Sequence, residues 1–161
     1  TLFRSLSIAM GIDWRGRKVK HGRVAYVAAE GADGFRKRLT AYAQQHEVDL
    51  ADVPMAVLDG APNLMLVDDT ADLAVGVLAA GEPSVVIVDT LAQTTPGANE
   101  NAGEDMGKAL AHCKGIHRAT GALVGDRGEV VAIHDHHGAS GEAGRCGVSA
   151  RFWCCTGSPR G

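Results

Sequence analysis

The chain has 161 residues, of which 45% are hydrophobic and 22% are charged, as is usual for one soluble globular domain with its own core. Its net charge of −3 and pI of about 6.1 argue against a protein that coats nucleic acid, so any contact with DNA must be local. No apolar run reaches the roughly 20 residues of a membrane helix, and the first residues, TLFRSLSIAMGIDW, lack the features of a signal peptide. A cytoplasmic location without membrane association is therefore expected.

Strand and helix patterns alternate along the sequence. The predicted elements, in chain order, are a strand over 22–31, a helix over 34–46, a strand over 54–60, a helix over 68–81 that ends on a glycine C-cap, a strand over 84–89, a loop over 94–105, a helix to about residue 120 and a strand from 122. Strands that alternate with helices indicate a parallel, three-layer α/β sheet.

Two of the predicted strands end in an acidic residue, Glu30 and Asp89. Taken alone, Asp89 is best explained as a residue that caps a turn. For Glu30, a favourable interaction with the dipole of the next helix explains the residue as well as a functional role does. If the two strands are parallel neighbours, both carboxylates lie on the edge where open α/β sheets bind ligands. Nucleotide hydrolysis needs such a pair, one carboxylate for the magnesium shell and one to orient the attacking water. Asp89 suits the first role and Glu30 the second.

Histidines and cysteines gather in the last third of the chain. The sequence HDHHG covers 134–138, and the four cysteines are Cys113, Cys146, Cys154 and Cys155. Neither the histidine nor the cysteine spacing fits a zinc motif. Structural or exposed histidines and reduced thiols are the favoured interpretation, and a zinc- or thiol-based protein remains an alternative.

The segment WRGRKVKHGR, residues 14–23, holds five Lys or Arg residues. A solvated loop before the first strand is the favoured interpretation, and a contact with nucleic acid or phosphate is the alternative.

The order of GIDWRGRKVKHGRVAYVAAEGADGFRKRLTAY, VVIVDTLAQTTPGANENAGEDMG, ATGALV and HDHHG resembles that of the RecA-like AAA ATPases of phages and plasmids, which are related to the RepA-type hexameric replicative helicases. The resemblance covers roughly 7–137. It implies a three-layer RecA-like P-loop NTPase core with a mostly parallel sheet, ATP and Mg²⁺ as cofactors, a hexameric homo-oligomeric ring, and DNA, single-stranded in particular, as partner.

The resemblance also implies roles for individual residues. Glu30 matches the catalytic glutamate, Arg38 a basic position on the following helix, and Asp89 the aspartate that holds magnesium through water. Thr90 follows Asp89 as in the family, and His136 matches a strand-end histidine that senses the γ-phosphate. The loop before the next helix matches at four further residues, namely Asn99, Glu100, Glu104 and Asp105.

The sequence departs from the family at both ends. The family's GxxxxGK[ST] loop, whose backbone N–H groups and lysine cradle phosphates, does not occur in the sequence. Residues 1–11 look like part of the helix that follows such a loop, with Leu2, Leu6 and Ala9 on one face. We therefore expect a core truncated at both ends and weak or absent ATP binding, because the carboxylates alone would repel a triphosphate.

The second departure is the tail. We expect a partial ATPase core over 1–138 and an irregular or disordered tail over 139–161 with no core face to bury. In permitted GC-rich codons, the segment 145–154 read two bases later restores the family's RG-SAL pattern, so a reading frame lost between about 124 and 145 is a further hypothesis. GDRGE, residues 125–129, also interrupts the continuous strand expected over 122–134.

Three functional classes remain open on this sequence. The leading one is a fragment of an ATP-hydrolysing motor domain of a DNA helicase or a related DNA-replication ATPase. The second is a degenerate, nucleotide-independent subunit that docks to others, and the third is the His/Cys metal-binding protein.

Overall fold

A computed structural model describes residues 1–99, 103–126, 129–132 and 151–154. The described strands form one sheet in the order β5-β4-β3-β1-β2-β6. Its centre is parallel and consists of β4 (Leu123–Asp126), β3 (Val85–Asp89), β1 (Val24–Ala28) and β2 (Met55–Asp59). Two antiparallel strands, β5 (Glu129–Ala132) and β6 (Arg151–Cys154), flank this centre. The predicted α/β class with a mostly parallel sheet is confirmed.

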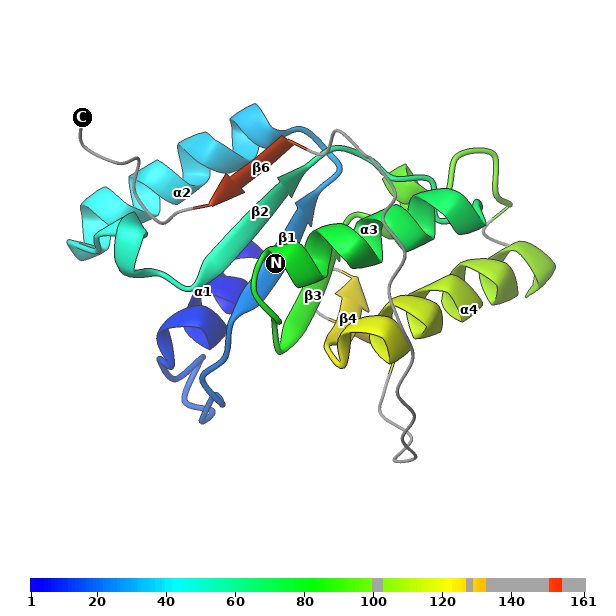
Figure 1. Cartoon of the computed structure of the whole chain (residues 1–161). Helices are drawn as coiled ribbons and strands as arrows, with labels where there is room; N and C mark the ends of the chain where they lie inside the picture. The colour runs from blue at the N-terminus through cyan, green and yellow to red at the C-terminus, as the bar shows by residue number, and fades with distance from the viewer. Residues whose placement is uncertain (100–102, 127–128, 133–150, 155–161) are drawn as a thin grey trace.

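Helices cover both faces of the sheet and make it the middle of three layers (Figure 1). One face packs against α1 (Leu2–Met10) and α2 (Ala32–His46), and the other against α3 (Val67–Ala79) and α4 (Gly103–Thr120). Two short 3₁₀ helices, η1 (Leu50–Asp52) and η2 (Leu91–Thr94), precede β2 and follow β3. No helix in the described part of the chain is long and apolar enough to cross a membrane.

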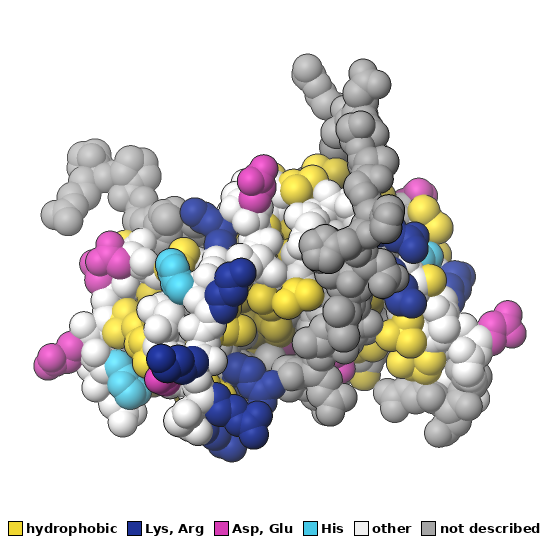
Figure 2. All heavy atoms as spheres, turned by 90° about the horizontal axis from the view of Figure 1, so that it is seen from below, with side chains coloured by type: hydrophobic (Ala, Val, Ile, Leu, Met, Phe, Trp, Pro, Cys, Tyr) yellow, Lys and Arg dark blue, Asp and Glu magenta, His cyan; other side chains and the backbone are white. Residues whose placement is uncertain are grey.

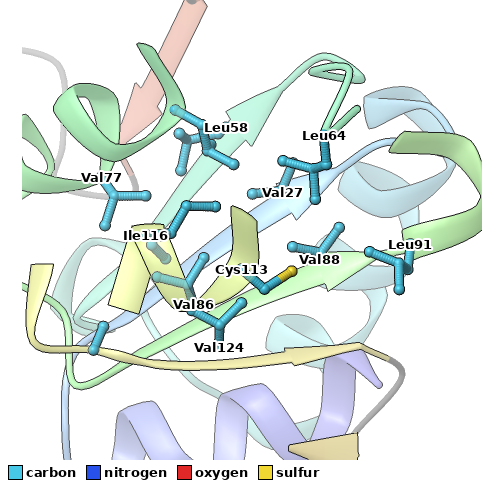
Figure 3. Close-up of a cluster of buried hydrophobic side chains, with 13 residues drawn as sticks. Val27, Leu58, Leu64, Val77, Val86, Val88, Leu91, Cys113, Ile116 and Val124 are labelled. Carbon is cyan, nitrogen blue, oxygen red and sulfur yellow. The ribbon is translucent and has the colours of Figure 1, made fainter. Parts of the chain in front are cut away.

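The strands are apolar on both faces because each face contributes to a separate core. Along β1, Val24, Tyr26 and Ala28 pack toward α1 and α2, while Ala25 and Val27 pack toward α3 and α4, as the two-residue period of a strand requires. The second core is shown in Figure 3, where side chains from the strands meet side chains from both helices, namely Val27, Val86, Val88 and Val124 with Val77, Cys113 and Ile116.

The helix at the start of the chain packs as its pattern predicts. Leu2, Leu6 and Ala9 are 4%, 0% and 0% exposed and lie in the core beneath α1. The glycine predicted at the end of α3 is confirmed: Gly81 follows the cap residue Ala80 with a φ of +101°, and its N–H donates to the carbonyl oxygen of Leu78 over 3.0 Å. The glycine thus serves the turn after the helix.

The segment after β4 differs from the continuous strand expected over 122–134. β4 ends at Asp126, and β5 returns antiparallel beside it with a register shift between Val124 and Gly125. Within the predicted irregular tail, Arg151–Cys154 form a strand that pairs antiparallel with β2, so the tail prediction does not hold for those four residues. The rest of the tail, with Cys146 and Cys155, lies outside the described residues, and the frame hypothesis stays a prediction.

The buried face of α4 supplies a stability test. Ile116 is 0% exposed, whereas Leu110 on the same helix is 37% exposed. We expect Ile116→Ala to lower the free energy of unfolding by about 2–5 kcal/mol, because it removes buried methyl groups and leaves a cavity. Leu110→Ala is the matched control and should cost less than about 1 kcal/mol. Urea denaturation measures both, and equal losses would contradict the assignment of the buried face.

Candidate functional site

The site lies where the parallel strands end, and the pairing of β1 with β3 aligns its two predicted carboxylates. Ala28 of β1 is the register partner of Asp89 of β3, and Glu30 follows two residues later. The loop after β1 is tied to the end of β3 because the N–H groups of Ala29 and Glu30 donate to the carbonyl oxygen of Asp89 over 3.0 and 3.3 Å. The condition under which the two acidic strand ends share one edge, that their strands are parallel neighbours, is therefore met.

Asp89 is oriented by a residue that the sequence reasoning did not single out. The hydroxyl of Tyr26, a residue that is 0% exposed, donates to Oδ2 of Asp89. Tyr26 lies two residues before Ala28 on the same face of the strand, so the register brings it to Asp89. An apolar alternation that includes a tyrosine two positions before the strand end is the signal that could have identified it.

The phenol of Tyr26 also shows which charges surround it. Three effects raise the pKa of Tyr26 well above its ordinary value. Burial contributes most, and the hydrogen bond to Asp89 and the negative charge of Asp89 add to it. The charge of Arg38 lowers this pKa and that of Glu30 raises it. Glu30, Arg38 and Asp89, three of the predicted site residues, therefore lie within electrostatic reach of one buried hydroxyl.

Thr90 presents a buried hydroxyl that lacks a partner. Its residue is 2% exposed, and Oγ1 forms no hydrogen bond with any described residue. Leaving such a group without a hydrogen-bond partner costs about 1–3 kcal/mol. A ligand bound next to Asp89 would supply that partner. Carboxylate and hydroxyl oxygens with water in between are the environment that magnesium prefers. The donor set of Asp89 and Thr90 therefore fits a hydrated magnesium ion.

Arginines of α2 lie beside this edge and differ in their partners. Arg38 is exposed, and its Nε donates to the carbonyl oxygen of Gly34 over 3.3 Å. Arg36 forms ion pairs with Asp33 at 3.5 Å and Asp59 at 3.6 Å. Exposed pairs of this kind contribute little to stability, but the second one joins α2 to the end of β2.

Asp59 and Asp126 are acidic strand ends that the sequence reasoning missed. Ala28 is the register partner of Asp59 as well as of Asp89, so both aspartates lie on the same face of the sheet. Asp126 ends β4, and its Oδ1 accepts the N–H of Leu91 over 3.0 Å. The rule that selected Glu30 and Asp89, an acidic residue after a buried strand, also applies to these two residues.

Asp126 acts on the opposite face of the sheet. Burial, and then the charge of Asp126, raise the pKa of the Cys113 thiol to about 11. Cys113 is 0% exposed and stays a neutral thiol at physiological pH. The expectation of a reduced thiol agrees with its free, buried state.

The loop residues matched through the resemblance are placed in part. The N–H of Asn99 donates to the Asp105 carboxylate over 2.9 Å, and Glu104 is exposed in the first turn of α4. Glu100 and the predicted sensor His136 lie outside the described residues.

The metal-binding alternative finds no site in the described part of the chain, where no three His, Cys, Asp or Glu side chains form a group that could hold a metal ion. His112 and His117 pair their Nδ1 atoms with the carbonyl oxygens of Leu64 and Ala122 over 2.6 and 2.7 Å, which is a structural use. The HDHHG segment lies outside the described residues.

Comparison with known families adds to this geometry. A family model described as the AAA domain matches residues 1–125. The chain belongs to the AAA domain family. That membership implies nucleotide binding and ATPase activity in general terms, and agrees with the RecA-like three-layer core. Searches of curated proteins and of solved structures find no significant match.

The raised pKa of Tyr26 gives a pH test. Because the folded pKa lies above the unfolded value, the stabilisation is fully present below about pH 10 and is lost as the pH rises beyond it. The chain has two tyrosines, so Tyr42→Phe leaves Tyr26 as the only one. We expect its phenolate absorbance to appear only together with alkaline unfolding, followed by circular dichroism. Phenolate formed near pH 10 in a chain with native circular dichroism would contradict the buried hydrogen bond.

Proposed function

We propose that the chain is the ATP-hydrolysing motor domain of a DNA helicase, or of a related DNA-replication ATPase, of the RepA-related phage and plasmid type. The observation that carries the proposal is the alignment of Ala28 with Asp89, which brings Glu30 and Asp89 to one sheet edge in a chain of the AAA domain family. This is the arrangement that attack by a water molecule on a magnesium-bound triphosphate requires.

Asp89 and Thr90 are the residues that would hold magnesium, through water. Tyr26 donates to Oδ2 of Asp89 and keeps the carboxylate fixed, so that Oδ1 can accept a hydrogen bond from a water of the metal's shell. The hydroxyl of Thr90 offers a second oxygen beside it. When bound, the ion supplies charge neutralisation for the β- and γ-phosphates.

Glu30 would orient the attacking water and accept its proton. Its side chain is exposed at the edge, while its backbone is held by the hydrogen bond from its N–H to the carbonyl oxygen of Asp89. This combination gives an accessible carboxylate on a fixed backbone. Arg38 would offset the negative charge of the phosphates, and His136 is proposed as the γ-phosphate sensor on the resemblance alone.

A ring of six identical subunits and a single-stranded DNA partner complete the proposal. Glu30 and Arg38 are exposed at the end of the sheet, which suits a nucleotide held between this surface and a neighbouring subunit. Cytoplasmic location belongs to the same proposal. The alternative is a docking subunit that does not use nucleotide. ATP hydrolysis in the experiments below would exclude it, and an absence of hydrolysis would support it.

Glu30→Gln tests the catalytic carboxylate. In a chain that carries a GxxxxGK[ST] loop ahead of Thr1, we expect ATP hydrolysis that this substitution lowers at least about a hundredfold, because a water-positioning group is lost. Phosphate release is the measurement. Glu47→Gln at the far end of α2, where Glu47 is an exposed C-cap, makes the same chemical change and should leave turnover within about twofold. Normal turnover in Glu30→Gln would remove Glu30 from the mechanism.

Asp89→Asn tests the magnesium site. In the same chain with a GxxxxGK[ST] loop ahead of Thr1, we expect nucleotide binding to lose its dependence on magnesium, because the carboxylate that attracts the hydrated ion becomes neutral. Titration of labelled ATP with and without magnesium measures this. Asp52→Asn, at an exposed residue of η1, is the control. An unchanged magnesium titration in Asp89→Asn would count against the assignment.

A further inference from the structure

A basic hollow lies beside α1, at the end of the sheet where the parallel strands begin. Its volume is about 670 Å³, and we call it the basic hollow; its lining combines cationic, aromatic and aliphatic side chains, namely Arg4, Ile8, Trp14, Arg15, Arg17, Lys18 and Val19. Figure 2 views the molecule from this end and shows Lys and Arg side chains gathered there. β1, which is five residues or about 16 Å long, runs from the end of this loop to the edge with the carboxylates.

The loop that forms the basic hollow is held by backbone contacts. Trp14 and Arg17 exchange two hydrogen bonds of 2.9 and 3.0 Å, and the turn between them places Gly16 at a φ of +75°. At the other end of the loop, the N–H of Gly22 donates to the carbonyl oxygen of Ile8 over 3.2 Å. The loop therefore presents its side chains from a folded turn anchored to α1.

The loop carries an excess of positive charge, even with Asp13 directly before it. Residues 14–23 contain five Lys or Arg and no Asp or Glu. The ion pairs that Arg36 forms with Asp33 and Asp59 lie on α2 and at the end of β2, away from this loop. Cations held close together without counter-charges repel one another, and binding a polyanion offsets this repulsion and releases its counterions.

Trp14 distinguishes the site from a simple charged patch. Its ring is partly buried in the hollow, and the guanidinium of Arg15 lies 5.3 Å from the ring centroid. Aromatic side chains next to arginines are the platforms on which unpaired bases stack, with about 1–3 kcal/mol for each base. A duplex keeps its bases stacked inside and offers none to such a ring.

We propose that the basic hollow binds a single-stranded nucleic acid, with its phosphates along Arg15, Arg17 and Lys18 and an unpaired base against Trp14. Arg15, Arg17 and Lys18 line the same hollow as Trp14, so phosphates and a stacked base of one strand can be held together there. The proposal deepens the proposed function and rests on it for the biological role of the strand, but the binding itself needs neither ATP nor the carboxylate edge.

Fluorescence anisotropy of a labelled oligo(dT) of about 20 nucleotides, longer than the 4–16 that one small binding fold typically covers, tests the proposal with the full chain and no nucleotide. The triple variant Arg15→Ala/Arg17→Ala/Lys18→Ala should bind at least tenfold more weakly. In this variant the slope of log K against log salt should also become less negative by about 2, because each of the three lost phosphate contacts contributes about −0.7 for a single strand. Trp14→Leu should weaken binding about fivefold or more without changing this slope.

The matched control removes the same charge elsewhere. Lys108→Ala/Lys114→Ala/Arg118→Ala lies on exposed positions of α4, and it should leave affinity within about twofold and the slope unchanged. Equal losses in both triple variants would overturn the proposal by showing that only overall charge matters. Circular dichroism checks that each variant is folded. For each folded variant, the slope of log K against log salt reports how many phosphate contacts remain.

Competitors separate the possible sources of phosphate. A duplex of the same length should compete at least about tenfold more weakly than oligo(dT), since its bases are not available for stacking. ATP without magnesium should compete only at millimolar concentration, because it offers few phosphates. Equal competition by duplex, or displacement by micromolar ATP, would overturn the assignment to a single strand. In the chain that carries a GxxxxGK[ST] loop ahead of Thr1, a Glu30→Gln variant that loses ATP hydrolysis but still binds oligo(dT) separates this site from the proposed hydrolysis.

Discussion

The parallel pairing of β1 with β3 is the contact on which both the core and the candidate site depend. Its register sets Ala28 against Asp89 and places Tyr26 where its hydroxyl reaches the Asp89 carboxylate. A slip of one residue in β1 would exchange its two faces. Tyr26 would then point toward α3 and α4, and Ala25 and Val27 would leave their core. The same apolar packing that makes the strand stable therefore also fixes the geometry of the carboxylates.

Four acidic residues at one sheet edge impose an electrostatic cost, and the structure handles each one differently. Asp89 accepts a hydrogen bond from a buried phenol, Asp59 pairs with Arg36, Asp126 accepts the N–H of Leu91, and the Glu30 side chain is exposed to water. Hydrogen bonds and ion pairs reduce the mutual repulsion of carboxylates, and a divalent cation would reduce it further. An edge of this kind favours metal-bound anions over anions alone.

The parallel sheet, the α helices and the proximity of Glu30 to Asp89 could be predicted, because β-branched runs and helical spacing are local signals and parallel strand ends share an edge. The partners of the charges could not. Whether Arg36 or Arg38 reaches a strand end depends on the rotation of α2 over the sheet, which the sequence pattern does not specify. The antiparallel additions β5 and β6 were also missed. A strand of four residues carries too short a pattern to be distinguished from a turn or a tail.

The distance along the chain between Tyr26 and Asp89, 63 residues, has a consequence for synthesis. The ribosome releases β1, α2, β2 and α3 before β3. During this time β1 can pair with β2 on one side, but its other edge, which pairs with β3 in the folded protein, is unpaired. That edge comprises Val24–Ala28, all of which are buried in the folded protein. Bringing the two ends of this segment together lowers the conformational entropy of the chain before the contact between β1 and β3 can stabilise it. Until then the nascent chain exposes an apolar strand edge that is open to mispairing with other chains.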